Sequence, residues 1–530
     1  MAEFDIVIHG GRLIDGTGNP WFYGDLAIKD GKIAHTGKIP PEAGARAISA
    51  KGYVVTPGFI DMHTHSDQPV IADGNAESKV RQGVTLDIIG ESQTVAPLQG
   101  AILEEYRLEH RKRNGIETDW TNFTGYFDSL RRGGASINIA SGVSPQQVKR
   151  VVCGFEERPA SAAEQEKMNR LVAQAMEEGA LGLTAAWHAK GPENPEEVVE
   201  MAKVAKNYGG YYGVHVGSEG FDMMEELAKT LRIAREAKIP VHVYHLKMRA
   251  KANWGRVRQV IAQLEEARRE GLDITANQYP YTAMQHPWRR LFPRWVQDAP
   301  LNETIARFKD PAFRERVIQD PEFHQYVDEH GGWEGVVAAR LDRPALKKFE
   351  GMTIAEIAGI REQDPVSACF DLIYDEGVFI HGVHHTMSED DVKAVMRVPW
   401  VSIGSDGSAL NLKYPGKPHP RSFGTNPRVL GKYTRDEKVL TLEDAVRKMT
   451  SMPAQVLGLK DRGQLREGYW GDIVIFDPDR VADTATYENP KQYPKGIDYV
   501  LVNGAVVIDN GQHTGARPGK VVYGPGYAGR

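Results

Sequence analysis

Cysteine is nearly absent from the chain: Cys153 and Cys369 are the only two among 530 residues. Two thiols exclude a disulfide framework and fit the reducing cytoplasm, where we expect the protein to reside. No stretch approaches the roughly 20 apolar residues that span a bilayer, and the start, MAEFDIVIHGG, lacks the basic region of a signal peptide. The formal net charge of −6 is mild, so it indicates neither a nucleic-acid nor a membrane partner.

The composition is that of an ordinary globular protein, with 41% hydrophobic and 26% charged residues. Both chain ends contain short alternating runs broken by Gly pairs and Asp-Gly turns, which are typical of β-strands and hairpins. Such runs are FDIVIHGGRLIDG and GDLAIKDGKIAHTG near the start, and GDIVIFDPD and DYVLVNGAVVIDNGQHTG near the end. We therefore predict that residues 1–56 and 451–530 together build one small β-sandwich.

The middle of the chain, residues 57–450, alternates candidate strands with helical patterns. Eight strands are expected, ending near FIDMHTH, VTLDIIGES, SINIASG, LGLTAAWH, YYGVHVGSE, IPVHVYHLK, DITANQYPY and WVSIGSDG. One helix between them, NPEEVVEMAKVAKNYGG, has Asn194 as its expected cap. This pattern favours an α/β fold with a parallel, TIM-like (β/α)8 barrel over the alternative, a doubly wound open sheet. The alternation breaks at about 284–377, which we interpret as an insertion that forms a lid or subdomain.

The first strand of the middle region finishes on two histidines, in TPGFIDMHTHSD. Residues i and i+2 of a strand share a face, so His63 and His65 can both point into the mouth of a barrel. Two imidazoles at this spacing are suitable ligands for zinc. Asp61 lies on the same face and can support a ligand. A single buried histidine is usually structural, so the pair alone does not decide between a metal site and packing.

Other predicted strand ends carry the groups that a hydrolytic metal site still needs. His215 closes YYGVHVGSE, His245 closes VHVYHLK, and Asp406 sits in WVSIGSDG. In a barrel, the C-terminal ends of the strands meet at one face, so these residues would converge on the two earlier histidines. An aspartate beside a metal-activated water can take its proton and later deliver that proton to the leaving nitrogen. The alternative for Asp406 is a cap of the following turn, which we favour less.

These motifs resemble the amidohydrolase superfamily, and within it the N-acyl-D-amino-acid deacylase (D-aminoacylase) family. The resemblance covers nearly the whole chain and includes GFIDMHTHSD, QGVTLDIIGES, QYPYTA, IGSDG, HPRSFGTNPRVLGKYTR and RKMTSMPAQVLGLKDRG. It implies a metal-bearing barrel with a two-ended β-sandwich, zinc as the usual metal, and hydrolysis of the amide in small N-acyl-D-amino acids. It further implies that His63, His65, His215 and His245 are metal ligands and that Asp406 is both a ligand and the general base. Lys247, Tyr279 and Arg421 match substrate-binding positions; without the resemblance, a core aromatic and a surface ion pair would explain Tyr279 and Arg421.

The sequence departs from the family pattern at two places. Where the family has Gly-Asn-Cys-Gly, whose cysteine is a metal ligand, this chain has Gly90-Glu91-Ser92-Gln93. We predict that Glu91 replaces the thiolate, which leaves open whether one or two zinc ions bind. The alternative is that Glu91 is an ordinary strand-end acid and the site is weakened or inactive. The family's His-x-Arg-Ser-Glu becomes HVGSE, and TAAWH brings in Trp187 and His188, so we expect a reshaped pocket.

Two other functions remain open at this point. Cleavage of a cyclic amide or ureido bond, as in the hydantoinase and dihydroorotase branch, typically uses a carboxylated lysine after a barrel strand, and LGLTAAW offers none. A barrel that has lost its chemistry and only binds a ligand is the other possibility. The acyl group, the amino-acid part, the preference for D-stereochemistry and the oligomeric state cannot be read from the sequence.

Overall fold

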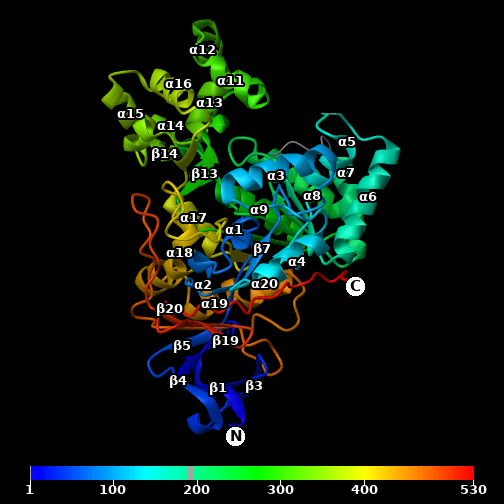
Figure 1. The fold of residues 1–530 in the computed structure, drawn as a ribbon, viewed down its shortest axis with the longest axis vertical. Coiled ribbons are helices and arrows are strands. Elements are labelled where there is room, and N and C mark those ends of the chain that lie inside the picture. Colours follow the sequence, from blue (N-terminus) through cyan, green and yellow to red (C-terminus); the bar gives the residue numbers. More distant parts are fainter. Residues whose placement is uncertain (1, 157, 189–194, 530) are drawn as a thin grey trace.

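The structure of the protein is a computed structural model that describes residues 2–156, 158–188 and 195–529. Strands from both chain ends join one sheet at one end of the elongated molecule (Figure 1). β5 of the N-terminal part pairs antiparallel with β17 of the C-terminal part, which places the two ends of the chain edge to edge. The strands of this sheet are β1 (Phe4–Leu13), β2 (Phe22–Lys29), β3 (Lys32–Gly37), β4 (Gly44–Ser49), β5 (Val54–Pro57), β17 (Ile473–Phe476), β18 (Ile497–Val502), β19 (Ala505–Asp509) and β20 (Gln512–His513).

The middle of the chain forms an α/β fold whose strands pair in parallel. One sheet has the order β6-β7-β8 and the other has the order β16-β12-β11-β10-β9. Isolated parallel bridges, Thr64 with Gly407 and Val143 with Leu183, link the edges of the two sheets. The strands are β6 (Phe59–Asp61), β7 (Val84–Ile89), β8 (Asn138–Ser141), β9 (Gly182–Ala186), β10 (Tyr211–His215), β11 (Val241–Val243), β12 (Ile274–Gln278) and β16 (Val401–Ile403).

Helices connect successive parallel strands and cover them, as the alternating pattern of the sequence predicts. Val198, Val199, Met201, Ala202 and Ala205 form the buried face of α7, whose predicted cap, Asn194, lies outside the described residues. The main helices of this region are α3 (Gly100–Asn114), α4 (Phe123–Gly133), α5 (Pro145–Cys153), α6 (Ala162–Glu177), α7 (Pro195–Asn207), α8 (Met223–Ala237), α9 (Val257–Arg269), α17 (Glu389–Met396) and, after the last parallel strand, α19 (Leu442–Met449).

The segment from β13 to β15 projects from the other end of the molecule (Figure 1). It contains an antiparallel sheet with the order β13-β15-β14 and packs around a hydrophobic cluster of its own that includes Trp288, Phe292 and Phe370. Residues 381–385, with the sequence HGVHH, form β15, the central strand of this sheet. The elements are β13 (Ala283–Pro287), β14 (Val336–Arg340), β15 (His381–His385), α10 (Arg294–Gln297), α11 (Leu301–Arg307), α12 (Pro311–Ile318), α13 (Pro321–Glu329), α14 (Gly332–Gly335), α15 (Ile354–Arg361) and α16 (Pro365–Glu376).

Candidate metal centre and active site

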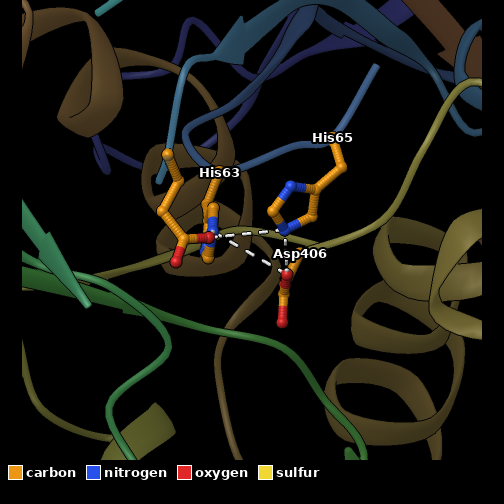
Figure 2. A group of neighbouring side chains, drawn as sticks. His63, His65 and Asp406 are labelled. Carbon is orange, nitrogen blue, oxygen red and sulfur yellow. Dashed lines mark hydrogen bonds and ion pairs between the residues drawn. The ribbon is translucent and has the colours of Figure 1, made fainter. Parts of the chain in front are cut away.

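The polar residues singled out in the sequence follow the C-terminal ends of the parallel strands. His63 and His65 come directly after β6, Glu91 after β7 and Asp406 after β16, while His215 is the last residue of β10. Because parallel strands present their carboxyl ends at one edge, these side chains share a single region. Figure 2 shows His63, His65 and Asp406 pointing toward one another.

Four of these side chains form a compact group. His63 Nε2 lies 2.7 Å from Glu91 Oε2, and His65 Nε2 lies 2.9 Å from Asp406 Oδ1. Cross-contacts complete the group, with His65 Nε2 at 3.3 Å from Glu91 Oε2 and His63 Nε2 at 3.7 Å from Asp406 Oδ1. His63, Glu91 and Asp406 are buried, whereas the His65 side chain is 42% exposed and therefore faces the opening.

Glu91 connects this group to a histidine of a more distant strand. Its second oxygen, Oε1, lies 2.7 Å from His215 Nδ1. Burial alone would raise the pKa of the Glu91 carboxyl, but the rings of His215 and His63 hold that pKa well below its usual range. Glu91 is thus an ionised carboxylate with one oxygen on each side of the site.

His245 lies at the same site, where it contacts two charged residues. Its Nδ1 lies 2.9 Å from Glu219 Oε1 and 2.7 Å from Lys247 Nζ. Lys247 and Glu219 also form a close ion pair. His245 Nε2 faces Asp406 Oδ2 at 3.8 Å, so the ring bridges the Lys247–Glu219 pair and the catalytic-aspartate candidate.

Asp406 also has a cationic partner. Arg421, the first residue of α18 (Arg421–Arg428), places Nη1 2.6 Å from Asp406 Oδ2. Burial raises the pKa of the Asp406 carboxyl, but Arg421 and His63 outweigh burial and hold the pKa well below its usual range. The ring of Tyr279 lies 5.0 Å from the Arg421 guanidinium carbon and 5.3 Å from Lys247 Nζ. The Tyr279 hydroxyl is buried and has no hydrogen-bond partner among the described residues.

The site opens into a cavity of about 670 Å³. Its floor is formed by the strand-end residues, and the projecting segment supplies one wall with Met284, His286 and Arg340. The loop 408–418 supplies another wall. The volume falls within the range of about 300–1,000 Å³ that is usual for small-molecule sites.

The comparisons with known proteins agree with this geometry. The sequence profile of the amidohydrolase family matches residues 46–508. The chain belongs to the amidohydrolase family. This amidohydrolase is 33% identical to D-aminoacylase of Alcaligenes xylosoxydans xylosoxydans, over 98% of this chain and 97% of that protein. It is 31% identical to N-acyl-D-glutamate deacylase of the same organism, again over 98% of this chain and 97% of the relative.

A solved structure shares the fold across the whole chain. N-acyl-D-glutamate deacylase from Bordetella bronchiseptica, complexed with zinc and a phosphonate inhibitor that mimics the tetrahedral intermediate, superimposes with a TM-score of 0.81. The two sequences are 28% identical, and the match covers 98% of this chain and 100% of that one. The resemblance inferred from the motifs is thereby confirmed, as is the expectation that the chain is an amidohydrolase enzyme.

The donor set of this amidohydrolase fits a divalent cation. His63, His65, Glu91 and Asp406 each offer one nitrogen or oxygen atom, and these four atoms lie within 4.8 Å of one another. Imidazole and carboxylate donors are what zinc accepts. The backbone also adopts uncommon conformations at this site, since Asp406 has φ of 50° and His245 has φ of 34°. Non-glycine residues rarely enter the left-handed region, and residues held in such sparsely populated conformations cluster at active sites.

A buried lysine ties the strand ends together beneath the site. Lys79 Nζ donates to Asp61 Oδ2 at 2.8 Å and to Ser405 Oγ at 2.7 Å. Asp61 Oδ1 in turn accepts from the backbone N–H of Ser405 at 2.8 Å. The network joins the strand that precedes His63 to the residue that precedes Asp406, so Asp61 holds these two strand ends together. Lys79 has no motif that would have marked it in advance.

Sequence reasoning also overlooked two side chains of the site itself. Glu219 pairs with Lys247 and His245. Its place in HVGSE, close to the predicted ligand His215, was the signal that could have identified it. His188, which the sequence indicated only as a pocket residue, lies against His215, with ring centroids 4.1 Å apart.

Among the described residues, no helix is both long and apolar enough to cross a membrane.

Proposed function

We propose that this amidohydrolase is a zinc-dependent deacylase that hydrolyses the linear amide bond of N-acyl-D-amino acids or closely similar N-acylated compounds. The observation that carries the proposal is the meeting of the His63–His65–Glu91–Asp406 group with the Arg421 guanidinium at one cavity, which His65, Glu91, Asp406 and Arg421 line. The relatives named D-aminoacylase and N-acyl-D-glutamate deacylase support the same reaction class. The few cysteines support a cytoplasmic location, which we include in the proposal.

We further infer that the two parallel sheets close into one (β/α)8 barrel over residues 57–450. The parallel bridges Thr64–Gly407 and Val143–Leu183, which join the sheets at both edges, support closure. On this view residues 1–56 and 451–530 make the β-sandwich, and residues 284–377 form an inserted subdomain that roofs the cavity. Met284, His286 and Arg340 line the cavity from that side, which supports a role in enclosing substrate.

We assign the metal ligands from the donor geometry. His63, His65 and Asp406 would hold an ion on one side, His215 and His245 on the other, and Glu91 would contribute between them in place of a thiolate. A bound zinc ion supplies Lewis acidity, which polarises the scissile carbonyl and lowers the pKa of water.

The proton transfers fall to Asp406. Its Oδ1 is turned toward His63 and His65, and its Oδ2 pairs with Arg421. Oδ2 would receive the proton of the attacking water when Arg421 pairs with the substrate carboxylate instead. Asp406 then delivers this proton to the departing amine nitrogen, because an amine leaves readily only when protonated. The carboxylate is buried, so bulk water does not compete for its proton.

Binding of the substrate is assigned to three residues. Arg421 is the partner for the carboxylate of the amino-acid part, since a guanidinium matches a carboxylate with two parallel hydrogen bonds. Lys247 and the unpaired hydroxyl of Tyr279 face the same space and would hold the carbonyl end. The cavity of about 670 Å³ leaves room for an acyl group or side chain larger than those of a simple N-acetyl amino acid.

The test is a hydrolysis screen with zinc-, cobalt- and manganese-reconstituted protein. Paired D- and L-N-acyl amino acids with several acyl groups are assayed for amine release, with a hydantoin and a dihydropyrimidine as cyclic amides. We expect turnover of linear D-substrates that stops on metal removal and returns on reconstitution. Turnover of only the cyclic amides would contradict the proposal in favour of a cyclic amidase. Absence of turnover with any metal would favour a ligand-binding relative without catalysis.

A further inference from the structure

His188 is an imidazole beside the candidate metal centre that the proposed ligand set does not use. β9 and β10 are parallel neighbours, and Ala186, the last residue of β9, pairs with His215. His188 follows two residues later, and the N–H of the intervening Trp187 donates to the His215 carbonyl oxygen at 3.0 Å. The backbone therefore fixes His188 at the level of the strand-end ligands.

The ring of His188 lies within reach of two of the assigned ligands. Its centroid is 4.1 Å from that of His215, and His188, His215 and Glu91 each offer a donor atom within 4.8 Å of the others. The Nδ1 atom of His188 is buried and has no hydrogen-bond partner among the described residues. A buried polar atom without a partner is costly, and most such atoms in proteins are paired.

We propose that His188 is a metal ligand, which together with Glu91 and His215 holds a zinc ion on the far side of Glu91 from His63 and His65. The inference rests on the proposed zinc-dependent function and adds a ligand to that site.

The chemistry of the donor set supports this ligand. Glu91 directs Oε2 toward His63 and Oε1 toward His215, so its carboxylate can serve two ions. The ion on the Oε1 side would then have the Glu91 carboxylate and the imidazoles of His188, His215 and His245, all of which are donors that zinc accepts. Because a carboxylate oxygen is a harder and weaker zinc donor than a thiolate, an extra imidazole compensates for the sulfur that this sequence lacks.

The placement of His188 also favours a fixed ligand over a mobile pocket wall. Its carbonyl oxygen accepts from Arg290 Nη2 at 3.2 Å, which ties the residue to the inserted segment.

Zinc–nitrogen and zinc–oxygen bonds of about 2.0–2.2 Å place two ligands of one tetrahedral ion roughly 3.4 Å apart. Because the three donor atoms lie within 4.8 Å of one another, a movement of the ring by at most about 1.5 Å brings them to coordination distance.

The experiment measures zinc directly and needs no substrate. Wild-type protein, His188→Ala and His188→Phe are titrated with zinc against a chromophoric chelator, and zinc content is determined by elemental analysis after dialysis. We expect both variants to lose one zinc per chain, or to bind one zinc at least about 10-fold more weakly than wild type. His188→Cys should retain wild-type affinity within a few-fold, because a thiolate is a zinc ligand.

His286→Ala is the matched control. His286 lines the same cavity and its ring centroid is 6.5 Å from that of His188, yet it belongs to none of the candidate ligand groups among the described residues. We expect its zinc affinity and content to equal those of wild type. The visible absorption of the cobalt-substituted protein provides a second readout, which should change in His188→Ala and remain unchanged in His286→Ala.

The outcomes separate this inference from the proposed function. If wild-type protein binds zinc and deacylates substrates while His188→Ala and His188→Phe keep both its zinc content and affinity, His188 is a wall of the cavity and the inference is wrong. If wild-type protein binds no zinc, the proposed function fails with it. If the variants lose zinc but no substrate is found, the ligand assignment stands and the substrate proposal does not.

Discussion

Glu91 Oε1 and His215 Nδ1 lie 2.7 Å apart, although Glu91 follows β7 and His215 ends β10, two strands that are not neighbours in a sheet. The contact therefore crosses the mouth of the site instead of running along one edge. The other oxygen of this carboxylate, Oε2, lies 2.7 Å from His63 Nε2, so one side chain touches histidines at the ends of two separate strands.

Replacing Glu91 with glutamine should weaken metal binding and catalysis together. The amide keeps the shape of the side chain but has neither negative charge nor two equivalent oxygens, so it cannot join the groups around His63 and His215. We expect reduced zinc content after dialysis and kcat lower by about 100-fold or more. Elemental analysis and steady-state kinetics on the same preparation check both parts.

Glu91→Cys distinguishes a ligand from a structural acid. A thiolate is a zinc ligand but accepts hydrogen bonds poorly, so this variant should recover zinc content while a purely structural acid would not be rescued. Equal zinc content in wild type and Glu91→Gln would show that Glu91 is no ligand.

Replacing Asp406 with asparagine should separate metal binding from turnover. The amide oxygen still faces His65, and the residues on the Glu91 and His215 side are unchanged. Zinc on that side should therefore be retained. The proton acceptor is lost, and general-base catalysis typically contributes about 100- to 10,000-fold to the rate. We expect kcat to fall within or beyond that range. Wild-type rates in this variant, measured at the same zinc content, would refute the general-base role.

Replacing Arg421 with methionine should raise KM for substrates that carry a carboxylate. Truncating one member of a buried charge pair costs about 2–5 kcal/mol, so KM should rise by roughly 100-fold. The matched substrate is the same N-acyl amino acid with its carboxylate converted to a carboxamide. If Arg421 reads the carboxylate, wild type and variant should bind the carboxamide almost equally. An equal KM increase for both substrates would indicate a general disturbance of the site through Asp406.

The site could be predicted from the sequence where a motif coincides with a strand end. His63, His65, His215 and Asp406 each stand at or just beyond the last residue of a parallel strand, so period-two alternation and fold class were sufficient to bring them together. Glu91 could be singled out because it stands one position from a missing cysteine. The joining of the two chain ends in one sheet followed from the shared texture of their strands.

The remaining parts depend on long-range contacts that no local pattern encodes. Lys79 lies in a short helix, α2 (Glu77–Val80), and its burial against Asp61 and Ser405 arises only when strands far apart in sequence meet. His188 was a lone histidine, and its significance depends on its distance from His215. The sequence of residues 408–418, which form one wall of the cavity, has no periodicity that would predict their position. That position follows from packing against the inserted segment.

The buried carboxyl of Asp87 provides a pH-dependent prediction. Asp87 Oδ2 accepts from Ser66 Oγ at 2.6 Å, and Oδ1 lies 3.7 Å from Lys79 Nζ. Burial is the main cause that raises the pKa of Asp87 from 3.8 to about 7, with the neighbouring Asp61 adding to it and Lys79 opposing it. Lys79 already forms a closer ion pair with Asp61, at 2.8 Å, so a second negative charge at Asp87 is poorly compensated.

A raised pKa means that the folded protein binds this proton more tightly than the unfolded chain does. The stability linked to Asp87 is therefore fully present below pH 3.8 and is lost as the pH rises through about 7. Asparagine resembles the protonated acid and does not titrate, so Asp87→Asn should remove this loss. We expect the variant to gain stability relative to wild type between pH 5 and pH 8, on the order of 2 kcal/mol.

Urea unfolding of metal-free protein at pH 5, 6, 7 and 8 measures this difference without competition between protons and zinc. The matched control is Asp479→Asn, which changes an exposed carboxylate and should leave the pH dependence of the unfolding free energy as in wild type. The two aspartates differ in burial and in their distance from Lys79, so a flatter pH dependence in Asp87→Asn alone can be assigned to the buried charge. Parallel pH dependences in wild type and Asp87→Asn would mean that Asp87 stays ionised, and that Lys79 neutralises both of its carboxylate neighbours beneath the site.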